Sequence, residues 1–160
     1  MNLKELTDYG KAEKEAYVKW IKKAKKVNNR LLDDQFHQLH QEAFRRIDCL
    51  VCANCCKTTS PIFRDVDIKR LSKRLRMSES RFMNTYLKID EDQDYVLQSS
   101  PCAFLGDDNY CSVYEDRPLA CREYPHTNRK NMYQILPLTR KNMEVCPAVS
   151  YIMKEINKKL

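Results

Sequence analysis

The chain has 160 residues, of which 42% are hydrophobic and 32% are charged, and its formal net charge is +7. No stretch approaches the roughly 18 consecutive apolar residues of a membrane span, so no membrane association is expected. Only two glycines are present, which excludes P-loops and dinucleotide-binding loops because these need several glycines at set spacing. The metalloprotease and nucleophile-elbow motifs are also missing. We therefore lean towards a protein that is not an enzyme.

The first 47 residues predict two amphipathic helices. Between residues 3 and 28 the apolar side chains follow a helical spacing: Tyr17, Trp20, Ile21, Ala24 and Val27. The same spacing recurs in a second segment: Leu32, Phe36, Leu39, Ala43 and Ile47. Side chains three and four residues apart share one helix face, and Asp33 and Asp34 suit the N-terminal end of the second helix. We expect a helical hairpin, 1–47, packed over a cysteine-rich metal-binding domain, 48–160.

The cysteines are the most informative feature of the sequence. There are eight, in the run Cys49-Leu-Val-Cys52-Ala-Asn-Cys55-Cys56 and at Cys102, Cys111, Cys121 and Cys146. Cysteines separated by two residues can converge on one zinc ion or iron–sulfur cluster, because both take several sulfur ligands. All eight are predicted metal ligands. The expected cofactor is zinc or iron, with a 4Fe-4S cluster as one form of the iron.

An even number of cysteines could instead indicate a disulfide framework in a secreted protein. The first thirty residues carry charged side chains where a signal peptide would need an apolar run. We therefore expect a cytoplasmic protein, whose thiols stay reduced. Adjacent cysteines such as Cys55 and Cys56 also suit metal binding better than pairing with each other, which strains the backbone.

Downstream of the run, residues 66–75 and 78–87 predict two short helices, with Ser78 capping the second. Residues 95–97 predict a strand, and the turn sequence at 106–109 would return Cys111 beside Cys102. Residues 132–138 predict a further strand and residues 149–160 a closing helix. The expected fold class is α+β, mainly α-helical: a small cysteine-cluster domain with short strands or a hairpin and an N-terminal helix pair.

The cysteines and their neighbours resemble a known family. The segments that carry the resemblance are Cys49-x2-Cys52-x2-Cys55-Cys56, Pro101-Cys102-Ala103-Phe104-Leu105, Cys111-Ser112-Val113-Tyr114, Arg117-Pro118-Leu119-Ala120-Cys121-Arg122 and Tyr124-Pro125. They are similar to the CxxCxxCC, or YkgJ-like, family of zinc- or iron-chelating proteins, over about residues 49–148. The resemblance implies a small bacterial metal-binding domain. It extends to the cysteine-rich part of a flagellin lysine methylase, which implies an iron–sulfur cluster. The family commonly has glycine where Ala53 stands here.

The spacing leaves the division of the sulfurs open. Two four-sulfur sites would use every cysteine, whereas one four-iron cluster would leave the others unused or on zinc. Cys49, Cys52 and Cys55 with the remote Cys146 loosely match a ferredoxin pattern. If the run is helical instead, Cys49, Cys52 and Cys56 share a face and Cys55 points towards a second centre.

Other candidate ligands are weaker. His126 follows Cys121 by five residues and could replace a thiolate or carry a proton beside the site. His37 and His40 lie three residues apart on a predicted helix and are interpreted as surface histidines. Arg117 and Arg122 flank Cys121 and could either donate hydrogen bonds to thiolates or form surface salt bridges.

Three functions follow from these observations. The favoured one is a metal-binding protein with a structural or metal-handling role. The alternatives are an iron–sulfur redox or radical accessory protein related to a protein lysine methylase, and a zinc-dependent nucleic-acid or protein interaction module. Metal ions are the expected partners and a protein partner is left open. Nucleic acid is not expected, because bound thiolates would lower the positive charge.

Overall fold

The computed structural model describes residues 1–160 and divides into two compact units. Unit 1 comprises Met1–Cys52 and Pro125–Leu160, and unit 2 comprises Ala53–Tyr124. Both units are mainly helical, and the one sheet is a two-stranded antiparallel hairpin. The predicted mainly helical α+β fold class is confirmed. None of the helices combines the length and the hydropathy that a membrane span requires.

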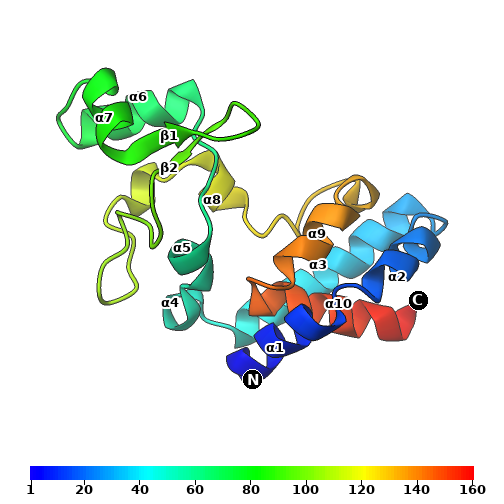
Figure 1. Ribbon diagram of the computed structural model, residues 1–160. Coiled ribbons are helices and arrows are strands. Elements are labelled where there is room, and N and C mark those ends of the chain that lie inside the picture. Colours follow the sequence, from blue (N-terminus) through cyan, green and yellow to red (C-terminus); the bar gives the residue numbers. More distant parts are fainter. The chain divides into compact units, whose positions relative to one another are not determined.

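Unit 1 is a helical assembly around a continuous apolar core. Its elements are α1 (Leu3–Glu13), α2 (Tyr17–Ala24), α3 (Asn29–Arg46), α4 (Cys49–Cys52), η2 (Met132–Gln134), α9 (Leu136–Asn142) and α10 (Pro147–Lys159). The closing helix α10 packs against α1, α3 and α9, and these helices lie beside one another in Figure 1. Phe36, Leu136 and Ile152 are fully buried in the core that they share. Segments from both ends of the chain therefore build one core.

The N-terminal helices differ from the prediction in one respect. The prediction of one continuous helix over residues 3–28 is wrong, because a turn separates α1 from α2. The turn lets α1 pack on α10 while α2 packs on α9, and the Tyr17 hydroxyl donates to the Met153 carbonyl at 3.0 Å. Unit 1 contains residues from both ends of the chain, because α1 and α3 bury their apolar faces on the C-terminal helix.

The segment before α9 is also not the predicted strand. Residues 132–138 form η2 and the start of α9. The Asp33 carboxylate on α3 accepts hydrogen bonds from the backbone N–H groups of Asn131, at 2.7 Å, and Met132, at 2.8 Å. Asn131 has a left-handed backbone, with φ 59°, which breaks an extended run. Asp33 thus anchors this turn, and the N-cap of α3 is Asn28.

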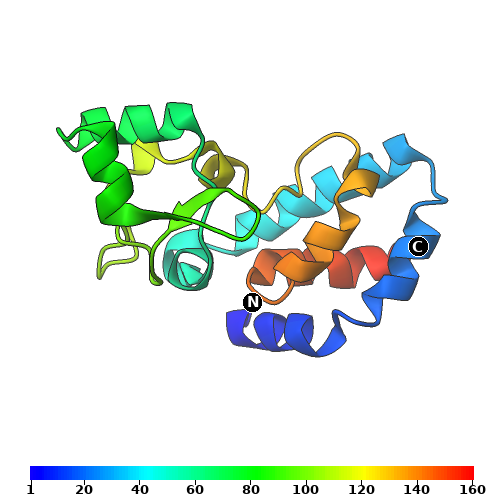
Figure 2. The ribbon, with the colours of Figure 1, turned by 45° about the horizontal axis from the view of Figure 1, so that its top comes forward.

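Unit 2 contains the hairpin and a separate core. Its elements are α5 (Asn54–Thr58), α6 (Asp65–Arg74), α7 (Glu79–Tyr86), β1 (Leu87–Ile89), β2 (Tyr95–Leu97), η1 (Tyr114–Asp116) and α8 (Leu119–Glu123). The helix α7 leads directly into β1 (Figure 2), and Leu87 pairs with Leu97 across the hairpin. The rings of Phe82 and Phe104 are parallel and stacked, with 6.3 Å between their centroids. The predicted strand at 95–97 and the Ser78 cap are confirmed, while β1 was not predicted.

Candidate metal centre

The cysteine run does not form one continuous helix. Cys49 and Cys52 lie on the single-turn helix α4, and Cys55 and Cys56 lie on α5. Between them Ala53 adopts φ 44° and ψ 18°, in the left-handed region. The single helical face that would have grouped Cys49, Cys52 and Cys56 is therefore not formed.

The left-handed Ala53 explains why glycine suits this position. A side chain in this region costs roughly 1–2 kcal/mol because Cβ approaches the following carbonyl oxygen. Glycine has no Cβ and avoids that contact. Part of the resulting stabilisation is offset because glycine has more conformational entropy in the unfolded chain. We expect Ala53→Gly to raise the free energy of unfolding by about 0.5–1 kcal/mol, measured by urea denaturation. Ala120→Gly, at a helical position of α8, should instead lower the free energy of unfolding. If both variants changed it equally, the inference that Ala53 is strained would be contradicted.

Four cysteines of unit 2 lie in one neighbourhood. The backbone N–H of Cys102 donates to the Cys56 carbonyl at 2.8 Å. The turn at 106–109 forms as predicted, because Gly106 N–H donates to the Tyr110 carbonyl at 2.8 Å and Leu105 forms a bridge with Cys111. Burial, followed by electrostatic repulsion from Cys56, Cys102 and Cys111, raises the pKa of Cys121 to about 12.

The sulfurs of this group accept hydrogen bonds from the main chain. The N–H groups of Phe104 and Leu105 donate to Cys102, and the N–H of Val113 donates to Cys111. Burial is the larger influence and leaves the pKa of both thiols raised, although these hydrogen bonds lower it. Hydrogen bonds to sulfur favour the thiolate, the form that binds metals. The pKa of Cys56 is lowered to about 7, mainly by a hydrogen bond with Cys55.

A second group lies in unit 1. Cys146 occupies the N-cap position of α10, where the backbone N–H groups of Val149 and Ala148 act to lower its pKa. Burial raises the pKa of Cys146 to about 12, and repulsion from Cys49 and Cys52 adds to the effect. The eight predicted ligands therefore divide between the units: Cys49, Cys52 and Cys146 in unit 1, and Cys55, Cys56, Cys102, Cys111 and Cys121 in unit 2.

The cysteine side chains have the chemistry that zinc and iron require of their ligands. Burial raises the pKa of Cys102, Cys111, Cys121 and Cys146, and a bound cation would favour the thiolate forms of these residues. As the side chains stand, however, no three His, Cys, Asp or Glu residues meet closely enough to hold a metal ion. Thiols are residue types that fit zinc or iron, and binding would require the sulfurs to come closer together.

The two candidate histidines of α3 have hydrogen-bond partners outside the cysteine groups. His37 bonds to the Arg129 carbonyl at 2.8 Å, and His40 bonds to the Thr127 hydroxyl at 2.8 Å. Neither histidine joins a metal-binding group. His126 has a left-handed backbone, with φ 63°.

The arginines beside Cys121 each donate to a main-chain carbonyl. Arg117 donates to the Tyr114 carbonyl and Arg122 to the Glu115 carbonyl, each at 2.8 Å. Arg117 still acts electrostatically on the sulfurs, lowering the pKa of Cys111 and Cys121 against the larger effect of burial.

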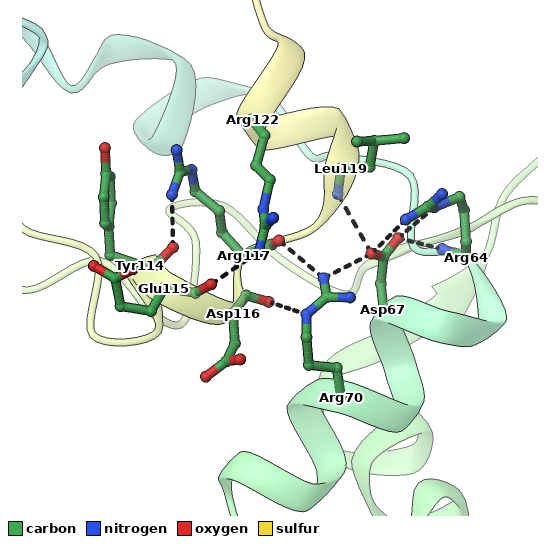
Figure 3. A network of polar contacts seen from close by, with 9 residues as sticks. All are labelled: Arg64, Asp67, Arg70, Tyr114, Glu115, Asp116, Arg117, Leu119 and Arg122. Carbon is green, nitrogen blue, oxygen red and sulfur yellow. Dashed lines mark hydrogen bonds and ion pairs between the residues drawn. The ribbon is translucent and has the colours of Figure 1, made fainter.

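A buried carboxylate beside the unit 2 cysteines was missed by the sequence reasoning. Asp67 on α6 is fully buried and forms ion pairs with Arg64 and Arg70 (Figure 3). Burial alone would raise the pKa of Asp67, but hydrogen bonds from Arg64, Arg70 and the Leu119 N–H hold it well below its usual range. The available signal was an acidic residue flanked at three residues on each side by arginine, next to the apolar Ile68 of an amphipathic helix.

The fold and this collection of thiols define a mainly helical protein with cysteine clusters suited to metal binding. A family model, CxxCxxCC, described as "Putative zinc- or iron-chelating domain", matches residues 48–147. That range covers more than half of the chain and includes all eight cysteines, so the chain belongs to this family. No curated protein and no solved structure shows significant similarity to it.

Proposed function

We propose that this protein binds zinc or iron through its cysteines and has a structural or metal-handling role. One proposed centre lies within unit 2 and uses Cys56, Cys102, Cys111 and Cys121. The observation that carries this proposal is the shared neighbourhood of these four residues, in which three thiols act electrostatically on the fourth. Membership of a chelating family supports it.

The unit 1 cysteines form a second proposed ligand group. Cys49 and Cys52 both act electrostatically on Cys146, which lies at the N-terminus of α10. Cys55 stays in the proposed ligand set and contacts Cys56. This division favours two metal centres over a single centre with unused thiols. A reducing compartment such as the cytoplasm would keep all these ligands available.

Zinc held by four thiolates has no open position for water or substrate. Such a centre would join α5, the turn between Cys102 and Cys111, and α8, which are short elements. The expected role of the unit 2 centre is therefore structural rather than catalytic. Metal binding of this kind contributes directly to folding.

An iron–sulfur cluster is the second candidate for the same residues. The observation that favours it is the set of main-chain N–H groups that donate to Cys102 and Cys111. Hydrogen bonds to the sulfurs are one of the means by which proteins tune the reduction potential of such clusters.

Anaerobic purification of untagged protein, with zinc and iron quantified, tests the proposal. We expect bound zinc or iron, and visible absorbance if the iron is in a cluster. Cys111→Ser and Cys52→Ser should each lower the metal content, and the double variant should lose both contributions because the two residues lie in different groups. His126→Ala serves as the control and should retain the full content. Protein without zinc or iron would contradict the proposed function.

A further inference from the structure

The polar network around Asp67 links α6 to the segment that carries two of the proposed ligands. The Asp67 carboxylate accepts hydrogen bonds from Arg64 Nε at 3.0 Å, from Arg70 at 2.8 Å and from the Leu119 N–H at 3.4 Å (Figure 3). Leu119 begins α8, and Cys121 follows two residues later. A buried charge on α6 thus holds the helix that bears Cys121.

Two arginines of α6 hold the preceding part of the same segment. Arg70 donates to the carbonyls of Asp116, at 3.2 Å, and Arg117, at 3.0 Å. Arg74 donates to the Asp116 carboxylate at 3.0 Å and to the Ser112 carbonyl at 3.3 Å. Ser112 directly follows Cys111, so these contacts cover the segment from one proposed ligand towards the other.

The geometry points to α6 as a positioning element for the unit 2 metal centre, with Asp67, Arg70 and Arg74 as the positioning residues that hold the main chain of the segment carrying Cys111 and Cys121. This inference rests on the proposed metal binding. The segment between these cysteines contains only the short elements η1 and α8, so its own hydrogen bonds hold it weakly. Metal affinity depends on how well the ligands are held before binding, and supporting residues typically change it by about 10- to 100-fold.

A residue with a purely structural role would behave differently. Its loss would lower the free energy of unfolding, while the folded protein would bind metal with the same affinity and the same ligand geometry. A positioning role instead predicts weaker binding by protein that is still folded. The two roles can therefore be separated at a temperature well below the melting transition.

Titration of reduced, metal-free protein with Co²⁺ tests the inference, followed by competition with Zn²⁺. Sulfur-to-cobalt absorbance reports the number of thiolates on the ion and its geometry. We expect Asp67→Asn and Arg70→Lys to weaken binding of both ions by about 10- to 100-fold and to change the cobalt spectrum. Asp65→Asn removes an exposed carboxylate from the first turn of the same helix and should leave affinity and spectrum unchanged.

The outcomes separate the two proposals. Wild-type affinity and an unchanged spectrum in folded Asp67→Asn and Arg70→Lys would overturn the positioning role alone. Failure of the wild-type protein to bind Co²⁺ and Zn²⁺ would contradict the metal centre itself, and the positioning role with it. If Asp67→Asn does not fold, Arg70→Lys decides the question, because it retains the positive charge and removes the paired donors to the two carbonyls.

Discussion

Replacing Asp67 by alanine is expected to lower the free energy of unfolding by about 3 kcal/mol, the lower end for breaking a buried ion pair. The carboxylate is fully buried, and its loss leaves Arg64 and Arg70 without their shared acceptor. The lower end applies because these arginine side chains are 48% and 31% exposed, so water recovers part of the interaction. Urea denaturation followed by circular dichroism measures the change.

Asp65→Ala is the matched control for this variant. Asp65 lies in the first turn of the same helix and is exposed, so its loss removes only a favourable interaction with the helix N-terminus. That interaction contributes roughly 0.3–1 kcal/mol. If Asp67→Ala proved no more destabilising than Asp65→Ala, the buried network would contribute little to the fold.

The same carboxylate predicts how stability depends on pH. Its pKa is lower in the folded protein than in the unfolded chain, so the folded state binds the proton less readily. The stabilisation is therefore fully present above the unfolded pKa of about 4, and it is lost as the pH falls through the lower folded pKa. Asp67→Asn should flatten this part of the acid stability profile, and an unaltered acid profile would contradict the assignment.

Gly10→Ala is expected to lower the free energy of unfolding by about 3 kcal/mol, as for strong overpacking of a core. A Cβ atom at this position would lie 2.0 Å from the Met143 carbonyl oxygen and 2.3 Å from Ser150 Oγ. Ser150 Oγ itself donates to that carbonyl at 2.7 Å, so neither atom can yield without losing a buried hydrogen bond. Thermal and urea denaturation both measure the loss.

The sign of the Gly10 effect is diagnostic. Alanine has a higher helix propensity than glycine by about 1 kcal/mol. Replacing an uncrowded glycine in α1 by alanine would therefore stabilise the protein. Gly106→Ala is the control, because the closest atom there is Asp108 Oδ1, at 2.7 Å, on a side chain that can move. We expect a change below about 1 kcal/mol for Gly106→Ala. A stabilised Gly10→Ala would show that α1 does not pack closely on the start of α10.

Local signals in the sequence predicted much of unit 2 correctly. The helices α6 and α7, the Ser78 cap, the strand β2 and the turn before Cys111 all form. These elements depend on spacing, capping and turn residues that act over a few positions. The predictions failed where distant segments decide the outcome. The turn between α1 and α2 depends on α9 and α10, and the turn before α9 is held by Asp33.

The sequence by itself determined the mainly helical class, the membership of a metal-chelating family and the candidate ligands, because residue type and short-range spacing carry that information. Only the tertiary structure decided that Cys146 lies with Cys49 and Cys52, while Cys121 lies with Cys56, Cys102 and Cys111. It alone showed Asp67 holding the segment next to Cys121. Such groupings depend on which buried surfaces and hydrogen-bond partners meet across long stretches of chain, and no local pattern encodes them.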